Sequence, residues 1–221
     1  MTWEEYAATW SDLHGGFDLA TASALIRGWV RLAYRGGRLL ARLRVGPGAV
    51  TAAGLLLCVA VPFAAALGPS GLLAGGVVVL LASVADGLDG AVAVVTHRAS
   101  RLGFVYDSVA DRVGEAAWLV AFWVAGVPGW LAVTAGAVSW LHEYVRARAA
   151  AAGMAGIGVV TVGERPTRVA VAVAGLVIGG AAGLVHDTWA APVLAIAAAA
   201  WLALALAGLA QLASTVHRTV S

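Results

Sequence analysis

Six long stretches of almost uninterrupted apolar residues alternate with short polar segments along the chain. A helix that spans a membrane needs about 20 mainly apolar residues, and each stretch has a length of that order. The stretches cover roughly residues 48–67, 71–95, 104–127, 129–150, 167–185 and 189–212. We therefore expect an all-α, polytopic membrane protein with six transmembrane helices.

The segment 18–44, which precedes these stretches, has a different pattern. Its basic residues recur at intervals of three and four positions and so share one helical face: Arg27, Arg31, Arg35, Arg38 and Arg42. Apolar residues such as Trp29 and Leu39 occupy much of the remaining surface. This pattern predicts an amphipathic helix on the anionic cytoplasmic leaflet. The alternative is a solvated linker that carries stop-transfer charges.

Three regions follow from these patterns. Residues 1–44 are expected to form a cytoplasmic and interfacial segment that contains the amphipathic helix. Residues 45–216 are expected to form one membrane domain of six helices, and residues 217–221 a cytoplasmic tail.

Arginines fall on alternate connections between the expected helices. They lie before the first stretch, between the second and third, between the fourth and fifth, and in the tail. The connections at 68–70, 127–129 and 186–188 contain no arginine. Because basic residues are retained on the cytoplasmic side, this distribution supports a count of six and places both termini in the cytoplasm. We expect a multi-pass protein of the cell membrane.

The composition excludes an ordinary soluble domain. Hydrophobic residues make up 61% of the chain, charged residues only 12%, and the mean hydropathy is +0.88. A soluble domain usually has about 25% charged residues, so most of this surface is expected to face membrane lipids. The single cysteine, Cys58, excludes an internal disulfide and a cysteine metal cluster. No nucleic-acid partner is expected.

Four aspartates interrupt the second and third apolar stretches. Asp86 and Asp89 are three residues apart, and Asp107 and Asp111 are four apart, so each pair projects from one face of its helix. An ionised aspartate at the centre of a membrane helix costs about 2.5–3.5 kcal/mol. A positive charge must therefore offset this cost. Because the two helices are consecutive and antiparallel, both pairs can meet at one depth.

Carboxylate oxygens are the ligands that Mg²⁺ or Mn²⁺ prefers. Four carboxylates are enough to bridge two such ions, and we expect a two-metal centre that faces the cytoplasm. Its predicted ligands are Asp86, Asp89, Asp107 and Asp111. The small residues around them, Gly87, Gly90, Ala91, Ala93 and Gly103, either pack the helices closely or leave room for a ligand.

These residues also carry a family resemblance. The segment Asp86-Gly-Leu-Asp89-Gly90-Ala-Val-Ala93, followed after nine residues by Gly103-Phe-Val-Tyr-Asp107-Ser-Val-Ala-Asp111, resembles the motif of the CDP-alcohol phosphotransferases. That motif reads Asp-x-x-Asp-Gly-x-x-Ala-Arg, eight residues, Gly-x-x-x-Asp-x-x-x-Asp. Two later segments, Tyr144-Val-Arg146-Ala-Arg148 and Glu164-Arg165-Pro166-Thr167-Arg168, resemble those of actinobacterial phosphatidylinositol phosphate synthases.

The resemblance implies a reaction. A phosphatidyl group would pass from a CDP-linked lipid such as CDP-diacylglycerol to a polar alcohol acceptor, with release of CMP, in phospholipid biosynthesis. Asp111 would be the general base, and the enzyme would be a homodimer. The residues that the resemblance assigns to the CDP end of the donor are Asp89, Gly90, Ala93 and Gly103.

Four arginines are candidates for the acceptor. If the acceptor bears a phosphate, as inositol phosphate does, bidentate arginine contacts are the natural means of binding it. The candidates are Arg146, Arg148, Arg165 and Arg168. The alternative is that they only set topology or bind lipid headgroups. Nearby, Glu115 is either a partner of the aspartate site or an ion-pair partner of Arg112, and His142 is expected to be a hydrogen-bonded structural residue.

Two other functions remain open on the sequence alone. The motif arginine is replaced by Val94, which is the best argument for a catalytically lapsed relative that acts as a binding protein. The aspartates would also suit a cation or proton transporter. However, the chain shows no inverted repeat of the kind that many transporters have.

Overall fold

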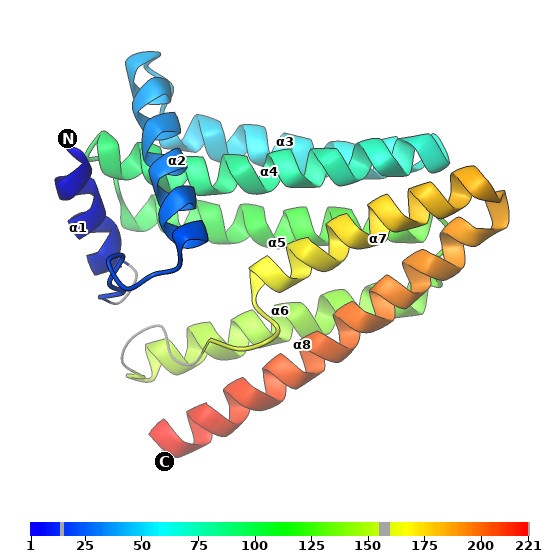
Figure 1. Ribbon diagram of the computed structural model, residues 1–221. Coiled ribbons are helices and arrows are strands. Elements are labelled where there is room, and N and C mark those ends of the chain that lie inside the picture. The colour runs from blue at the N-terminus through cyan, green and yellow to red at the C-terminus, as the bar shows by residue number, and fades with distance from the viewer. Residues whose placement is uncertain (14–15, 155–159, 221) are drawn as a thin grey trace. The chain divides into compact units, whose positions relative to one another are not determined.

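A computed structural model of the chain describes residues 1–13, 16–154 and 160–220, and its regular elements within these ranges are all helices (Figure 1). They are α1 (Trp3–Leu13), α2 (Ala24–Arg42), α3 (Pro47–Ala65), α4 (Pro69–Val95), α5 (Arg101–Val124), α6 (Gly129–Ala151), α7 (Arg165–Val185), the short 3-10 helix η1 (Asp187–Trp189) and α8 (Ala190–Val220). The six expected apolar helices correspond to α3–α8. The amphipathic segment forms α2.

Two details differ from the sequence pattern. Helix α1 is not predicted by the pattern, because its 11 residues are too few for the long apolar stretches that mark the other helices. Helix α8 continues to Val220, so the expected tail at 217–221 is helical as far as it is described. Ser221 lies outside the described residues.

Four of the helical segments are long and apolar enough to cross a membrane. They are α3, α4, α7 and the segment Asp187–Thr219, with mean hydropathies of 2.0 to 2.4 over their most apolar parts. Helices α5 and α6 are long enough but less apolar, because they carry charged residues that include Asp107, Asp111 and Glu143. The protein is thus a polytopic membrane protein with four candidate spans, and the count of six stays a prediction.

The chain divides into two compact units. The first contains Met1–Leu55 and Ala82–Asp111, and the second contains Leu56–Leu81 and Arg112–Ser221. Each unit has its own packing and its own polar cluster. They are described separately below.

The core of the first unit joins α1, α2 and the end of α4. Three aromatic rings pack together in this core. The ring centroids of Tyr6 and Tyr34 lie 5.0 Å apart, and those of Trp3 and Tyr34 lie 5.6 Å apart. The Tyr34 hydroxyl donates a hydrogen bond to the Met1 carbonyl at 3.0 Å. The whole cluster consists of Tyr6, Leu19, Ala22, Val30, Ala33, Tyr34, Ala91 and Val94. Burial raises the pKa of Tyr6 to about 12, so its hydroxyl stays neutral at physiological pH.

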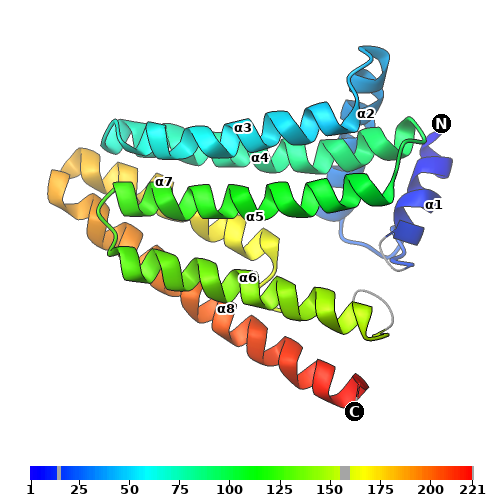
Figure 2. The same cartoon turned by 180° about the vertical axis from the view of Figure 1, so that it is seen from behind.

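In the second unit α8 lies along both α6 and α7 (Figures 1 and 2). Its buried Trp201 donates an indole N–H to the Ser139 hydroxyl of α6 at 2.9 Å. Further along, Gly208 of α8 faces the segment before α7 so closely that a Cβ on Gly208 would lie 2.7 Å from the Gly163 Cα and nitrogen. Glycine at position 208 therefore lets the backbone before α7 rest directly on α8.

This contact gives a stability prediction. Gly208→Val should lower the free energy of unfolding by about 1–3 kcal/mol, because the new side chain overlaps the Gly163 backbone and overpacks the contact. A thermal denaturation series in detergent measures the change. Ala207→Val, at the exposed neighbouring position, is the matched control and should have little effect. Equal midpoints for the two variants would contradict the close contact.

Candidate functional site

Three of the four predicted metal ligands are brought together in the first unit. One carboxylate oxygen each from Asp86, Asp89 and Asp107 lies within 4.8 Å of the other two. The i, i+3 spacing on α4 directs two of them to one face, and α5 contributes the third. Asp111 follows Asp107 by one turn of α5 and is half-buried. It is not one of the three, so its part in a metal centre stays a prediction.

Asp89 is the most enclosed of these carboxylates, with 6% of its surface exposed. It accepts a hydrogen bond of 2.6 Å from the Thr51 hydroxyl of α3. Three ionised carboxylates at this separation repel one another strongly in a region of low dielectric. Divalent cations with oxygen ligands would balance the cluster. The residues present therefore fit Mg²⁺ or Mn²⁺.

A pocket of about 670 Å³ opens beside this cluster within the first unit. The four residues predicted to contact the CDP end of the donor, Asp89, Gly90, Ala93 and Gly103, all line it. Asp107, Thr51, Arg98, Arg101, Val94 and Leu13 line it as well. Its volume is typical of sites that enclose small molecules. Acidic ligands for cations and two arginines in one pocket suit a polyanion that binds together with metal ions.

The end of α4 sets the position of the basic side of the pocket. His97 takes a left-handed backbone conformation (φ 55°), and the Arg98 N–H donates to the Ala93 carbonyl at 2.8 Å. This is a common way to stop a helix, although the left-handed residue is usually glycine. The turn ends α4 at once and leads into the connection that carries Arg98 and Arg101.

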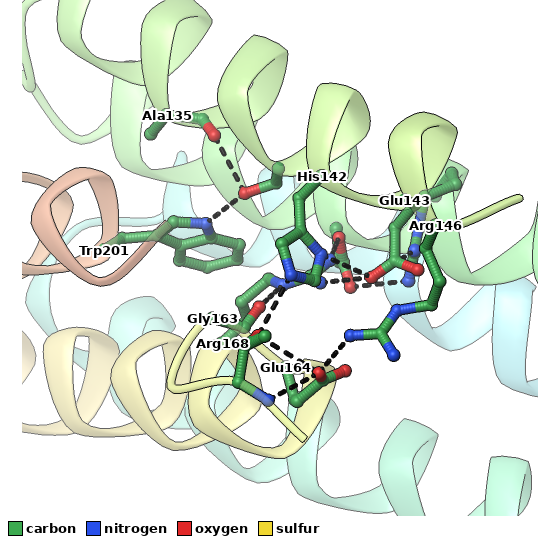
Figure 3. A network of polar contacts seen from close by, with 12 residues as sticks. Ala135, His142, Glu143, Arg146, Gly163, Glu164, Arg168 and Trp201 are labelled. Carbon is green, nitrogen blue, oxygen red and sulfur yellow. Dashed lines mark hydrogen bonds and ion pairs between the residues drawn. The ribbon is translucent and has the colours of Figure 1, made fainter. Parts of the chain in front are cut away.

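A second polar cluster lies in the second unit and centres on Arg168 of α7 (Figure 3). Its guanidinium pairs with Glu115 of α5 at 2.7 Å and with Glu143 of α6. Arg112 pairs with the same two carboxylates, at 2.9 and 3.1 Å. Arg168 also donates to the Gly163 carbonyl at 2.8 Å. Two arginines and two glutamates thus link three helices, and each buried charge has an opposite charge as its partner.

The same cluster holds the segment before α7. The His142 ring, whose Nε2 lies 2.9 Å from the Thr161 hydroxyl, connects α6 to this segment. Glu164 accepts hydrogen bonds from the Thr161 N–H at 2.9 Å and from Arg146 of α6. Figure 3 shows the side chains of His142, Arg146 and Glu164 converging between α6 and the start of α7. His142 is therefore the hydrogen-bonded structural residue that the sequence predicts.

The four predicted acceptor arginines have different surroundings. Arg168 is 2% exposed and bound to two glutamates. Arg146 is half-buried and paired with Glu164, Arg165 is half-buried, and Arg148 is exposed. Glu115 is an ion-pair partner of Arg112, which was one of the two readings of this residue. A role of the arginines toward an acceptor stays a prediction.

Comparison with known proteins decides the family. Residues 44–209 match the family described as CDP-alcohol phosphatidyltransferase. The chain belongs to the CDP-alcohol phosphatidyltransferase family. This is a family of membrane enzymes, and the resemblance drawn from the aspartate motif is confirmed.

Individual relatives point the same way. The archaetidylinositol phosphate synthase of Pyrococcus horikoshii is 30% identical over 132 residues, which are 58% of this chain and 69% of that protein. The phosphatidylinositol phosphate synthase of Mycobacterium tuberculosis with CDP-diacylglycerol bound has a TM-score of 0.63 and 25% identity, over 86% of this chain and 94% of that one. The same synthase in complex with manganese and citrate has a TM-score of 0.65 and 24% identity, over 84% and 88%.

Sequence reasoning missed two residues of this phosphatidyltransferase's pocket. Thr51 lies near the start of the first apolar stretch, and its bond to Asp89 joins positions 38 residues apart. Leu13 lies in a helix that no long apolar stretch marks, and nothing near it in sequence indicates a pocket. A threonine in an otherwise apolar stretch could have indicated a polar site at Thr51. No comparable feature of the sequence marks Leu13.

The arginine cluster gives a prediction on stability. Arg168→Leu should lower the free energy of unfolding by about 3–5 kcal/mol, because it leaves the buried carboxylate of Glu115 with less positive charge around it. Unfolding in SDS or by heat measures the loss. Arg148→Leu, at an exposed position, is the matched control and should stay within about 0.5 kcal/mol of the parent. Similar losses for both variants would refute a special role for Arg168.

Proposed function

We propose that this enzyme transfers a phosphatidyl group from CDP-diacylglycerol to the hydroxyl of a polar alcohol and releases CMP. The observation that carries the proposal is the group of three carboxylates within 4.8 Å, two of which line a pocket of a size suited to a nucleotide. The family match over residues 44–209 supports it. A relative of known structure that binds CDP-diacylglycerol supports the choice of donor.

The metal centre that we propose uses Asp86, Asp89 and Asp107, with Asp111 completing a site for two Mg²⁺ or Mn²⁺ ions. When bound, these ions would offset charge on the donor pyrophosphate and stabilise the departing CMP. Thr51 holds the Asp89 carboxylate in one orientation through its hydrogen bond. Arg98 and Arg101 add positive charge on another side of the pocket.

Asp111 is the proposed general base. Its carboxylate takes the proton from the acceptor hydroxyl, the acceptor oxygen forms a bond to the phosphorus that carries the lipid, and the bond from that phosphorus to CMP breaks. A carboxylate close to cations has a lowered pKa. It therefore acts mainly by being correctly placed, rather than by being a strong base.

We further propose six transmembrane helices, with both termini and the site on the cytoplasmic side of the cell membrane. The charges that keep α5 and α6 below the hydropathy of an ordinary span include Arg112, Glu115 and Glu143, which pair with one another or with Arg168. Ionisable side chains that pair inside a helical bundle are tolerated at membrane depth. Large apolar side chains that stay exposed, such as Leu56 and Phe63, would face lipid.

The acceptor proposed from the relatives is a phosphorylated alcohol of the inositol phosphate class. Arg146, Arg148, Arg165 and Arg168 remain the proposed phosphate ligands. Since Arg168 already binds two glutamates, its part would be to hold the start of α7 as well as to add positive charge. A homodimer is proposed by the same resemblance, and α2 is proposed to lie at the membrane surface with its arginines toward anionic headgroups.

An activity assay tests the reaction. Purified protein with CDP-diacylglycerol, Mg²⁺ or Mn²⁺ and a panel of alcohols, inositol phosphate included, should release CMP with at least one of them. Asp111→Asn should lower the rate at least 100-fold, consistent with loss of a general base. Asp187→Asn, in the exposed 3-10 helix η1, is the control and should retain activity. Absence of CMP with every acceptor would favour a lapsed relative, and metal flux without CMP would favour a transporter.

Metal binding is tested separately from turnover. Titration of Mn²⁺ into the chelator-treated protein, followed by electron paramagnetic resonance, should show saturable binding. Asp89→Asn and Asp107→Asn should each weaken it at least tenfold, because each removes an anionic ligand from the cluster. The Asp187→Asn control should bind as the parent does. Equal affinity in all four proteins would mean that the carboxylates do not hold the metal.

A further inference from the structure

The last residue of α1 lines the pocket that we assign to the donor. Leu13 shares this pocket with Asp89, Asp107 and Arg98, although it precedes the nearest of them by 76 residues. The end of α1 is fixed in place by its own contacts. The Ser11 hydroxyl donates to the Phe17 carbonyl at 2.9 Å, and the rings of Trp10 and Phe17 meet edge to face with centroids 6.1 Å apart.

Helix α1 is held against α2 and α4 by a buried core. Tyr6, 1% exposed, lies in one cluster with Tyr34 of α2 and Val94 of α4. The Arg31 guanidinium lies over the Trp3 ring at 5.2 Å from its centroid, which adds a cation–π contact at the start of the helix. An 11-residue helix is too short to be stable alone in water, so these contacts determine where Leu13 lies.

Val94 belongs both to the buried cluster that holds α1 and to the lining of the pocket. It is 6% exposed within the cluster that holds α1, and it also lines the pocket. Within that cluster Val94 packs with apolar and aromatic residues such as Tyr6, Leu19 and Ala91, where an apolar side chain carries no desolvation cost. Valine is therefore the kind of residue that allows α1 to dock here.

We propose that α1 forms a wall of the donor pocket, with Leu13 contacting the nucleoside end of the CDP-linked donor and so helping to determine which donor binds. This inference rests on the proposed function. The acidic cluster and the two arginines account for the pyrophosphate. Leu13 precedes the first candidate span and shares the pocket with the 98–101 connection, outside the apolar spans where acyl chains would lie. The nucleoside is the part of the donor that remains for it.

Nucleotide binding tests this directly, without turnover. CDP is titrated into the full-length protein in the presence of Mn²⁺, with calorimetry as the readout. Leu13→Trp should raise the dissociation constant for CDP at least fivefold, because the indole occupies space beside the base. Inorganic pyrophosphate, which lacks the nucleoside, should bind Leu13→Trp within twofold of the parent. Asp12→Trp introduces the same bulk one position away and should change CDP affinity less than twofold.

A second pair of variants tests the docking of α1. Tyr6 does not line the pocket, so it acts on the donor only as a positioning residue for α1. Tyr6→Ala should weaken CDP at least threefold while leaving the Mn²⁺ dissociation constant unchanged. Tyr6→Phe keeps the ring in the cluster and should restore the parent affinity for CDP. This pair keeps the test decisive even if Leu13→Trp fails to fold.

Several results would overturn the proposal. One is an unchanged CDP affinity in Leu13→Trp and Tyr6→Ala. Another is an equal loss of CDP and pyrophosphate in Leu13→Trp, which would indicate damage to the charged part of the pocket rather than loss of a nucleoside contact. If the parent protein releases CMP but its Leu13 variants bind CDP normally, only the role of α1 fails. If the parent neither binds CDP nor releases CMP, the proposed function itself fails.

Discussion

Repulsion between aspartate carboxylates is the constraint on which the catalytic part of this protein depends. Three carboxylate oxygens within 4.8 Å of one another repel strongly when they are ionised in a region of low dielectric. The protein maintains this arrangement with two helices that each carry a pair of aspartates, and with Thr51, whose hydroxyl orients the most buried carboxylate. This concentration of negative charge is what makes the three carboxylates fit a divalent metal ion.

The second unit also places carboxylates close together, but it balances their charge with arginines. There the buried charges of both signs are supplied by the chain itself, and Arg168 with Arg112 balances Glu115 with Glu143. A cluster that balances its own charges needs no metal ion to do so. The contrast separates a cluster that fits a metal ion from a cluster that links helices. Each contains one buried acidic residue, Asp89 in the first unit and Glu115 in the second, and the two clusters differ in that the second supplies its own arginines.

Much of the fold follows from the sequence because apolar length and arginine position are local signals. The helices that correspond to 71–95 and 129–150 begin and end within a few residues of the predicted bounds. The aspartate pairs follow for the same reason, since i, i+3 and i, i+4 spacing fixes a helical face. The packing of α1 does not follow, because it depends on a buried cluster that brings together Tyr6 and Val94, which are 88 positions apart. Nor does the pairing of Arg168 follow, because its partners Glu115 and Glu143 precede it by 53 and 25 positions and lie on two other helices.

The balance of charges around Arg168 limits how the sequence of this part of the chain can evolve. Arg112, Arg146 and Arg168 pair with Glu115, Glu143 and Glu164, so the formal charges of the six residues cancel. A single replacement leaves one buried charge in excess, whereas a matched replacement of an arginine and a glutamate does not. Substitutions at these positions should therefore arise in pairs among relatives. Positions 115, 143 and 168 should covary more tightly than their distance along the chain suggests.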